Sequence, residues 1–341
     1  MLERIPFLIL AMQASNYNGK IFLNPVHTDV MNPGAFFRVM RKFFQKHPGR
    51  EPQTPLGPFS VDHALLQNLS PNALRTTWLG HSTLLIETAG KRFLTDPVWY
   101  NRVSPFGFIG PKRFFKNPLA LAQLPTIDCI LLSHDHYDHL DKKTIIQLAQ
   151  KNIPVVTMLG VGKRLVKWGI PSTSVTELAW WESVEILPGF TVTATPSRHF
   201  SGRWLNDRFK TLWGAFAIKS PLHNVFFGAD SGYYDGFKTI GEKLGPFDLV
   251  MLEIGAYNED WEAIHMGPEK AVQATLDLGN PFLLPIHWAT FNLALHSWKE
   301  PVERLVAEAG QKGVRLLLPA PGEAVTFQQQ PYNSQWWTRY H

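Results

Sequence analysis

The sequence predicts a layered α/β fold in which two β-sheets are covered by helices. Three observations support this prediction. The 341 residues are 45% hydrophobic and 18% charged, which is typical of a globular protein and excludes a disordered chain or a coiled coil. From Arg75 onward, short apolar runs rich in β-forming residues follow one another, and helical stretches lie between them. Hairpins and strand–helix units are therefore mixed along the chain.

Residues 1–73 are expected to form an irregular lead-in that packs on the core, and residues 74–341 the main domain. Four prolines and two glycines between Pro48 and Pro58 oppose regular structure there. Before them, apolar residues at helical spacing alternate with basic ones and predict a short basic amphipathic helix. Its apolar residues are Phe36, Phe37, Met40, Phe43 and Phe44, and its basic ones Arg38, Arg41, Lys42 and Lys46. This helix could pack on the main body or contact a membrane interface.

The main domain has ten predicted strands, a hairpin turn at Ala89-Gly90-Lys91 and five predicted helices. The strands are Thr76–Leu79, Thr83–Thr88, Arg92–Thr95, Asp128–Ser133, Phe190–Thr195, Leu212–Lys219, Asn224–Gly228, Asp248–Ile254, Pro281–Ile286 and Val314–Leu318. The helices are Asp141–Lys151, Gly162–Trp168, Tyr234–Leu244, Pro268–Leu278 and Pro301–Ala309, two of which begin with a proline suited to the first turn.

Composition also limits the classes of function. The net charge of +5 permits anionic substrates or membranes without indicating a nucleic-acid partner. The single cysteine, Cys129, excludes an internal disulfide and a Cys-based zinc site, and we expect it to be buried and inert. No apolar run is long enough for a transmembrane helix. The apolar stretch Ile5–Met12 lacks the basic cluster of a secretion signal, so we expect a cytoplasmic protein, with peripheral membrane contact as an alternative.

The strongest local signal for chemistry lies between Ser133 and His139. Four potential metal ligands, His134, His136, Asp138 and His139, fall within six residues directly after an apolar strand. Alternate side chains of an extended segment point the same way, so such a segment can fold around a metal. Imidazole and carboxylate together suit zinc, iron or manganese.

A second signal is distributed over the chain. Three further apolar runs lead to ligand-type residues, namely to His199, to Asp230 and to His287. Because loops converge at strand ends in α/β sheets, we expect these three residues to join the first cluster.

The order His-x-His-x-Asp-His followed by His199, Asp230 and His287 resembles the metallo-β-lactamase superfamily. Within it, the chain is most similar to the branch of N-acyl-phosphatidylethanolamine-hydrolysing phospholipase D. The motifs that carry this resemblance are Phe22-Leu23-Asn24-Pro25, Thr77-Trp78-Leu79-Gly80-His81, Leu94-Thr95-Asp96-Pro97, Gly110-Pro111-Lys112-Arg113, Trp180-Trp181-Glu182, Leu212-Trp213-Gly214, Gly245-Pro246-Phe247-Asp248, Ile254-Gly255-Ala256-Tyr257 and His287-Trp288. The resemblance implies a four-layer αββα sandwich with a metal pair at the edge of its two sheets.

The resemblance also implies a ligand set. His134, His136 and His199 would hold one divalent ion; Asp138, His139 and His287 would hold the other; and Asp230 would bridge them. Zinc is the first expectation for both ions, with iron or manganese as alternatives. The implied activity is that of a binuclear metal-dependent hydrolase, a phospholipase D-like phosphodiesterase in which a metal-bridging hydroxide attacks phosphorus. A lactonase or carboxylic-ester hydrolase on the same site is the alternative.

Asp138 and His265 are the predicted catalytic residues. His265 precedes a predicted helix and matches a histidine of the branch; it could polarise the substrate or protonate a leaving group, or it could cap the helix or pack. His81 and Asp96 are expected to orient ligands or to make structural hydrogen bonds. Two departures from the branch concern acidic residues: Glu253 replaces a proline, and Asn258-Glu259-Asp260 stands where Pro-Arg precedes an aromatic residue.

Two other classes built on this fold are disfavoured. Flavodiiron oxidoreductases carry a glutamate where this chain has His136, and they add a flavin domain. Nucleases of the superfamily usually carry an inserted domain, for which the 31 positions from His199 to Asp230 leave no room. We therefore expect a small-molecule or phospholipid substrate and no nucleic-acid partner.

Overall fold

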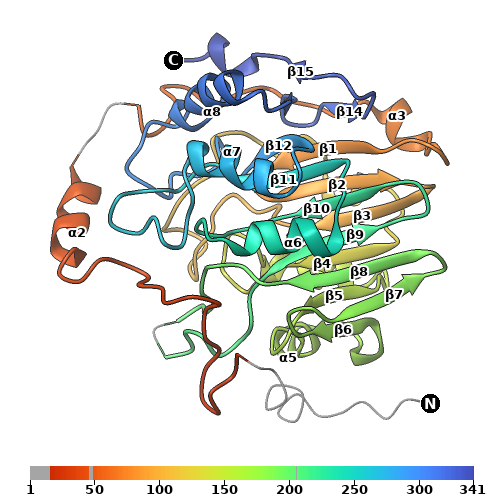
Figure 1. Cartoon of the computed structure of the whole chain (residues 1–341), viewed down its shortest axis with the longest axis horizontal. Coiled ribbons are helices and arrows are strands. Elements are labelled where there is room, and N and C mark those ends of the chain that lie inside the picture. Colours follow the sequence, from red (N-terminus) through yellow and green to blue (C-terminus); the bar gives the residue numbers. More distant parts are fainter. Residues whose placement is uncertain (1–15, 46–48, 205) are drawn as a thin grey trace.

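The computed structural model describes residues 16–45, 49–204 and 206–341. They fold into two facing β-sheets with helices on both outer faces, which confirms the predicted four-layer αββα class (Figure 1). The stretch Ile5–Met12, on which the question of a secretion signal rests, lies outside the described residues.

The first sheet has the strand order β14-β1-β2-β3-β4-β5-β6. Strands β1 to β3 form an antiparallel meander, and β3 to β6 run parallel. The predicted turn is present: Ala89 and Gly90 both have positive φ, 46° and 74°, as a two-residue hairpin turn of type I′ requires. The strands span Arg75–Gly80 (β1), Thr83–Thr88 (β2), Lys91–Thr95 (β3), Cys129–Leu132 (β4), Val155–Met158 (β5), Val175–Leu178 (β6) and Ala324–Thr326 (β14).

The second sheet has the order β12-β11-β10-β9-β8-β7, and a small pair joins β13 to β15. Its strands span Ser183–Leu187 (β7), Phe190–Thr195 (β8), Ala215–Lys219 (β9), Asn224–Phe227 (β10), Leu249–Glu253 (β11) and Phe282–Ile286 (β12); the pair spans Leu317–Leu318 (β13) and Tyr332–Asn333 (β15). All ten predicted strands are present, but β9 and β13 begin about three residues later than predicted, a typical boundary error. Five further strands, β5, β6, β7, β14 and β15, were not predicted.

Helix α5 packs on β6 of the first sheet, α7 packs on β11 of the second, and α6 and α8 pack on α7 (Figure 1). The helices span Phe36–Phe44 (α2), His63–Gln67 (α3), Lys142–Ala149 (α4), Gly162–Lys167 (α5), Gly236–Leu244 (α6), Pro268–Asp277 (α7) and Glu300–Lys312 (α8), with 3-10 turns at Leu121–Gln123, Ser172–Ser174 and Trp336–Arg339. Local sequence sets their ends: Asp141 caps α4, and Gly313 ends α8 at a left-handed φ of 70°. Within the described residues, no helix is both long and apolar enough to cross a bilayer.

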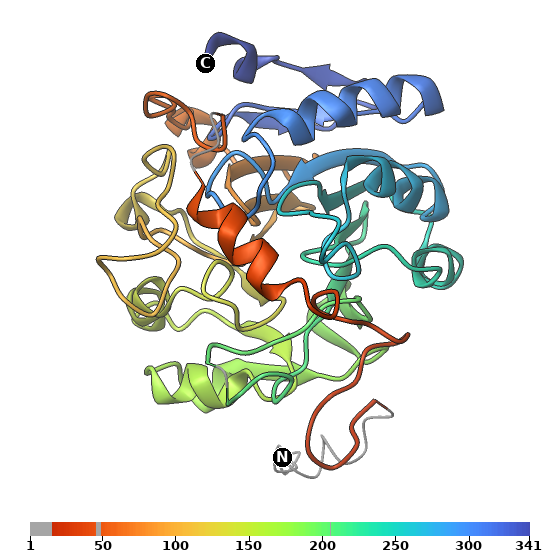
Figure 2. The same cartoon turned by 90° about the vertical axis from the view of Figure 1, so that its left-hand side faces the viewer.

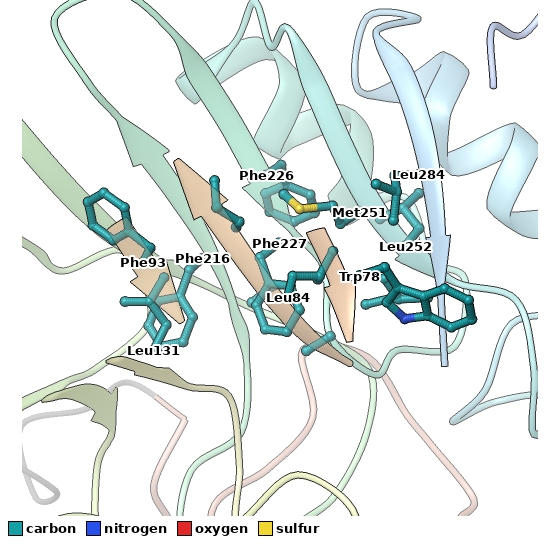
Figure 3. Packing of buried hydrophobic residues seen from close by; sticks show 14 of the residues in the cluster. Trp78, Leu84, Phe93, Leu131, Phe216, Phe226, Phe227, Met251, Leu252 and Leu284 are labelled. Atoms are coloured by element: carbon teal, nitrogen blue, oxygen red, sulfur yellow. The ribbon is translucent and has the colours of Figure 1, made fainter. Parts of the chain in front are cut away.

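The core fills the space between the two sheets. Phe93 and Leu131 from the first sheet face Phe216 and Phe227 from the second, and none of these side chains is exposed (Figure 3). Each such side chain stabilises the fold by about 1.5–3 kcal/mol relative to an exposed one. Cys129 lies in this core as expected, and burial raises the pKa of its thiol to about 12.

Strand direction explains where a site can form. In the first sheet β1, β3 and β4 run the same way, and in the second β8, β10, β11 and β12 do. The carboxyl ends of these seven strands lie at one end of the sandwich. Every predicted ligand follows one of them, so the fold places loops from distant parts of the sequence at a common edge.

Candidate metal centre

The structure brings all seven predicted ligand side chains together at this edge. The segment after β4 supplies His134, His136, Asp138 and His139, whereas His199 follows β8, Asp230 follows β10 and His287 directly follows β12. Their nitrogen and oxygen atoms, together with those of His81, form two adjacent groups, and within each group all potential ligand atoms lie within 4.8 Å of one another. A third group, formed by Asp230, Glu253, His265 and His287, shares one residue with each of them.

The first group contains three histidines and Asp230. Nδ1 of His136 lies 2.9 Å from Nε2 of His134 and 3.3 Å from Nε2 of His199. Oδ2 of Asp230 lies 3.9 Å and 3.6 Å from the same two Nε2 atoms. Three ring nitrogens and one carboxylate oxygen therefore face a common point, as in a four-ligand zinc site.

The second group contains Asp138, His139 and His287, together with His81. Oδ2 of Asp138 lies 3.5 Å from Nε2 of His139 and 3.4 Å from Nε2 of His287. Asp230 reaches this group as well, because its Oδ2 lies 3.1 Å from Nε2 of His139 and its Oδ1 lies 3.2 Å from Nε2 of His287. Asp230 thus lies between the two groups, the position that the resemblance implied for a bridging ligand.

Hydrogen bonds at the opposite ring nitrogens fix the imidazoles. Nδ1 of His134 lies 2.9 Å from Oγ of Ser133, and Nδ1 of His199 donates to the carbonyl of Ile264 at 2.8 Å. Nδ1 of His139 lies 2.7 Å from Oδ2 of Asp96, whose carboxylate is fully buried. Such partners hold the other nitrogen of each ring toward a metal and raise its basicity.

His81 and Asp96 both contact predicted ligands, and both have an unusual backbone. Nε2 of His81 lies 2.9 Å from Oδ2 of Asp138. His81, Asp96 and His287 each directly follow a strand and have positive φ values of 55°, 31° and 62°. Such conformations cost about 1–3 kcal/mol each in non-glycine residues and persist where the surrounding structure enforces them. Here they turn the chain sharply at the strand end and place the side chain in the site.

The histidines of the two groups differ in the direction in which their surroundings shift the pKa of the ring. Burial lowers the pKa of His136 and His199 to about 3 and that of His134 well below its usual value, so these rings are neutral, as metal ligands must be. For His139 and His287 burial acts in the same direction, but the charges of Asp230 and Asp138 outweigh it. They raise the pKa of His139 well above its usual value and that of His287 to about 10. The two carboxylates therefore favour a positive charge at this point.

These residues fit a divalent metal pair. Among the described residues, Nε2 of His139, Nε2 of His287 and Oδ1 of Asp230 are buried and form no hydrogen bond. Buried polar atoms of this kind are costly unless another group binds them. The donors are imidazole nitrogens and carboxylate oxygens, which suit zinc, iron or manganese, and the two carboxylates supply the compensating negative charge.

His265 lies beside this cluster and pairs with Glu253, which in the sequence stood out only as a departure from the phospholipase branch. Nδ1 of His265 lies 2.6 Å from Oε2 of Glu253, the last residue of β11. The Glu253 carboxyl is fully buried, and its Oε1 accepts a hydrogen bond of 2.6 Å from the backbone N–H of Ser231. Burial and the charge of Asp230 raise the pKa of Glu253 well above its usual value. The only signal in the sequence was that Glu253 replaces a proline.

A pocket of about 320 Å³ opens over the cluster. His136, Asp138, Asp230, His265 and His287 form its polar floor, and its walls are mostly apolar. The wall residues are Val30, Met31, Val39, Phe43, Phe200, Ala256, Trp261, Ile264 and Leu293. Arg208, which the sequence analysis missed, adds a cation beside the Phe200 ring, 4.9 Å from its centroid. No local motif indicated Arg208, because only the fold brings its loop to the pocket.

Helix α2 lies across the front of this edge (Figure 2). Its Val39 is buried against Trp261 and Ile264, and Phe43 stacks on Trp261. Lys42 pairs with Glu259 at 3.1 Å, and Arg38 pairs with Asp260. These two acidic residues therefore hold α2 and do not enter the pocket. On the same helix, Phe36 and Phe37 remain 57% and 84% exposed.

Comparisons with known proteins agree with this geometry. The profile of the β-lactamase superfamily domain matches residues 91–288. An uncharacterised protein of Mycobacterium tuberculosis is 42% identical over 92% of this chain and 84% of its own length. N-acyl-phosphatidylethanolamine-hydrolyzing phospholipase D 1 of Caenorhabditis elegans is 38% identical over 69% of this chain and 70% of its own. The isothiocyanate hydrolase of Delia radicum gut bacteria has the same fold, with a TM-score of 0.59 and 20% identity over 74% of this chain and 98% of its own.

Proposed function

Because the chain belongs to the metallo-β-lactamase superfamily of metal-dependent hydrolases, we propose that it hydrolyses a phosphodiester bond in a phospholipid or a smaller diester. The observation that carries the proposal is the pair of His/Asp groups, with Asp230 between them, at the floor of a pocket with an added cation. The similarity to N-acyl-phosphatidylethanolamine-hydrolysing phospholipases supports the phosphodiester over other bonds.

In this proposal His134, His136 and His199 hold one ion, Asp138, His139 and His287 hold the other, and Asp230 contacts both. Zinc is the expected metal, and iron and manganese suit the same donors. A bound metal pair supplies Lewis-acid polarisation of phosphoryl oxygens and a water of lowered pKa.

The protein's own side chains bind and orient the substrate. The Arg208 guanidinium offers charge-assisted hydrogen bonds to a phosphate oxygen, which are about twice as strong as neutral ones. Trp261, Phe200 and Leu293 present an apolar wall that suits an acyl chain and excludes water from the reacting group.

His265 is placed to supply a proton. Because Glu253 occupies Nδ1, the nitrogen left for the substrate is Nε2. We assign His265 Nε2 as the group that gives its proton to the departing alkoxide, while the Glu253 carboxyl, whose pKa is raised, holds the ring and gives its own proton to Nδ1. This role explains why a carboxyl group is buried beside the imidazole.

The leaving group provides the test of His265. With a diester that releases an alkoxide, such as glycerophosphoethanolamine, His265→Ala should lower kcat by about 10²–10⁴-fold, the range of general acid–base assistance. With bis-p-nitrophenyl phosphate, whose leaving group departs without a proton, the loss should be much smaller. His223→Ala, in the turn between β9 and β10, is the matched control. Equal losses on both substrates, or loss of metal from His265→Ala, would contradict the assignment.

The substrate class is tested by comparing bis-p-nitrophenyl phosphate with p-nitrophenyl acetate and a lactone on metal-loaded protein. We expect hydrolysis of the phosphodiester, abolished by a chelator and restored by zinc. Turnover of the ester or lactone alone would replace the proposed function by its alternative, a carboxylic-ester hydrolase.

Helix α2 suits contact with a lipid surface, where such a substrate resides. Phe36 and Phe37 are exposed beside the pocket, and Arg41 lies on the same helix. Phe36→Ser with Phe37→Ser should weaken sedimentation with phosphatidylcholine vesicles that contain phosphatidylglycerol. Leu222→Ser, an exposed residue before β10, is the control. If the wild-type protein never sediments with these vesicles at low salt, α2 is not a membrane contact.

A further inference from the structure

A second cavity, of about 530 Å³, lies beside the candidate metal centre. Tyr137, which stands in the chain between His136 and Asp138, forms part of its wall, together with the start of α4 and the end of α5. None of the predicted metal ligands lines it. Six cationic side chains do: Arg102, Lys142, Lys143, Arg164, Lys167 and Arg203.

The charges of this cavity are mostly unpaired. Arg164 alone is neutralised, by Asp135 at 2.8 Å and Asp207 at 2.6 Å. The single carboxylate in the wall, Asp141, already accepts hydrogen bonds from the N–H of Lys143 and from the hydroxyl of Thr144, because it caps α4. Within the described residues, no carboxylate lies within 4.0 Å of the charged groups of the remaining five cations.

Arg203 shows that the cavity is a built site and not a loose surface patch. Its guanidinium lies 3.8 Å from the centre of the Tyr137 ring and 5.3 Å from that of Trp168. Nη1 donates to the carbonyls of Asp135 at 2.9 Å and Leu140 at 2.7 Å. The cation is therefore held rigidly against aromatic rings and neutral carbonyls, and burial lowers its pKa. An anion in the cavity would offset this desolvation.

Lysines complete the arrangement at the mouth. Nζ of Lys143 lies 4.8 Å from the centre of the Tyr100 ring and Nζ of Lys142 lies 6.0 Å from that of Trp168, whereas Lys167 is exposed. A rigid guanidinium inside and exposed ammonium groups outside suit a group with several anionic oxygens, because each oxygen can accept a charge-assisted hydrogen bond.

We propose that this cavity binds a phosphate group at a site separate from the candidate metal centre. The inference goes beyond the proposed function, since the cavity contains no predicted ligand or catalytic residue. The phosphate has two sources of the same chemistry, the headgroup of an anionic phospholipid and a soluble organophosphate. The loop beside the cavity favours the phospholipid headgroup. Its side chains Phe106, Phe108 and Ile109 are 49%, 80% and 57% exposed, as in segments that enter a lipid interface.

The test measures binding directly. One arm titrates the metal-loaded protein with sn-glycerol 3-phosphate by calorimetry, with glycerol as the neutral control. The other measures sedimentation with phosphatidylcholine vesicles with and without phosphatidylglycerol. The double variant Lys143→Gln/Lys167→Gln should weaken binding of the probe about tenfold or more, because each removed cation contributes to the free energy of binding an anionic group. Lys238→Gln with Lys312→Gln, on exposed faces of α6 and α8, removes the same charge elsewhere.

The outcomes separate the sources. If the Lys143→Gln/Lys167→Gln variant binds sn-glycerol 3-phosphate more weakly, a soluble ligand is supported. If the variant binds only the anionic vesicles more weakly, a phospholipid headgroup is supported. Equal effects of the two double variants, or no binding of either probe to wild-type protein, would overturn the proposal. Hydrolysis of bis-p-nitrophenyl phosphate is followed in parallel. A protein that fails to hydrolyse the diester, but whose binding of either probe is weakened by the Lys143→Gln/Lys167→Gln pair, contradicts the proposed function and leaves the cavity site supported.

Discussion

Replacing Asp96 by asparagine should weaken metal binding although Asp96 need not touch a metal. Oδ1 of Asp96 accepts from the N–H of Ser133 at 2.8 Å, whereas Oδ2 accepts from the Ser133 hydroxyl at 2.6 Å and faces Nδ1 of His139 at 2.7 Å. An asparagine that keeps the first bond must turn its NH₂ toward His139. Two N–H groups would then face each other.

The imidazole can avoid this clash only by moving its proton to Nε2, the nitrogen that faces Asp138 and Asp230. A protonated Nε2 has no lone pair for a metal. Loss of such a supporting partner typically costs about 10–100-fold in metal affinity, equivalent to about 1.4–2.8 kcal/mol. The loss in metal affinity should be near tenfold if the His139 ring can rotate. The ring is completely buried, which opposes rotation.

Affinity is measured by competition with a chromophoric zinc chelator, and metal content by elemental analysis. Asp248→Asn is the matched control, because Oδ2 of Asp248 also accepts from a backbone N–H, that of Asn224 at 2.8 Å, but at the start of β11. Thermal unfolding of both variants checks that they fold. A folded Asp96→Asn protein with wild-type zinc affinity would refute the tautomer argument.

Further predictions concern the metal pair and the core. Asp230→Ala should lower occupancy at both metal positions in elemental analysis, since Asp230 lies between the two groups; loss of one equivalent alone would contradict the shared role. Chelation should lower Tm, because a ligand bound only by the folded state stabilises it, and an unchanged Tm would argue against tight binding. Cys129 should resist alkylation at pH 8 until the chain unfolds, because burial raises its pKa to about 12; rapid labelling of native protein would disprove this. Phe226→Ala should lower the free energy of unfolding by about 3–5 kcal/mol in denaturant titrations, and a loss below about 1 kcal/mol would show a core that repacks.

Much of the fold could be predicted because its signals are local. Strand β8, at Phe190–Thr195, was predicted with the bounds that it has, since apolar β-formers stand between turn residues. By contrast, β7 was missed: Ser183–Leu187 has no fully buried residue and carries a glutamate, so no continuous apolar run marks it. This segment is a strand because it pairs with β8 at the edge of the second sheet, which its composition alone does not indicate.

By itself, the sequence predicted the types of metal ligand and determined the strand ends that carry these side chains, because metal chemistry restricts the donors and apolar runs show where strands stop. The resemblance to the superfamily implied which of these side chains would share a metal ion. Only the tertiary structure decided what lies around them. It pairs His265 with Glu253, brings Arg208 to the pocket and gathers unpaired cations beside Tyr137. Glu253 and His265 stand 12 residues apart, and the cations of the second cavity come from several separate segments, so no local sequence pattern encodes these contacts.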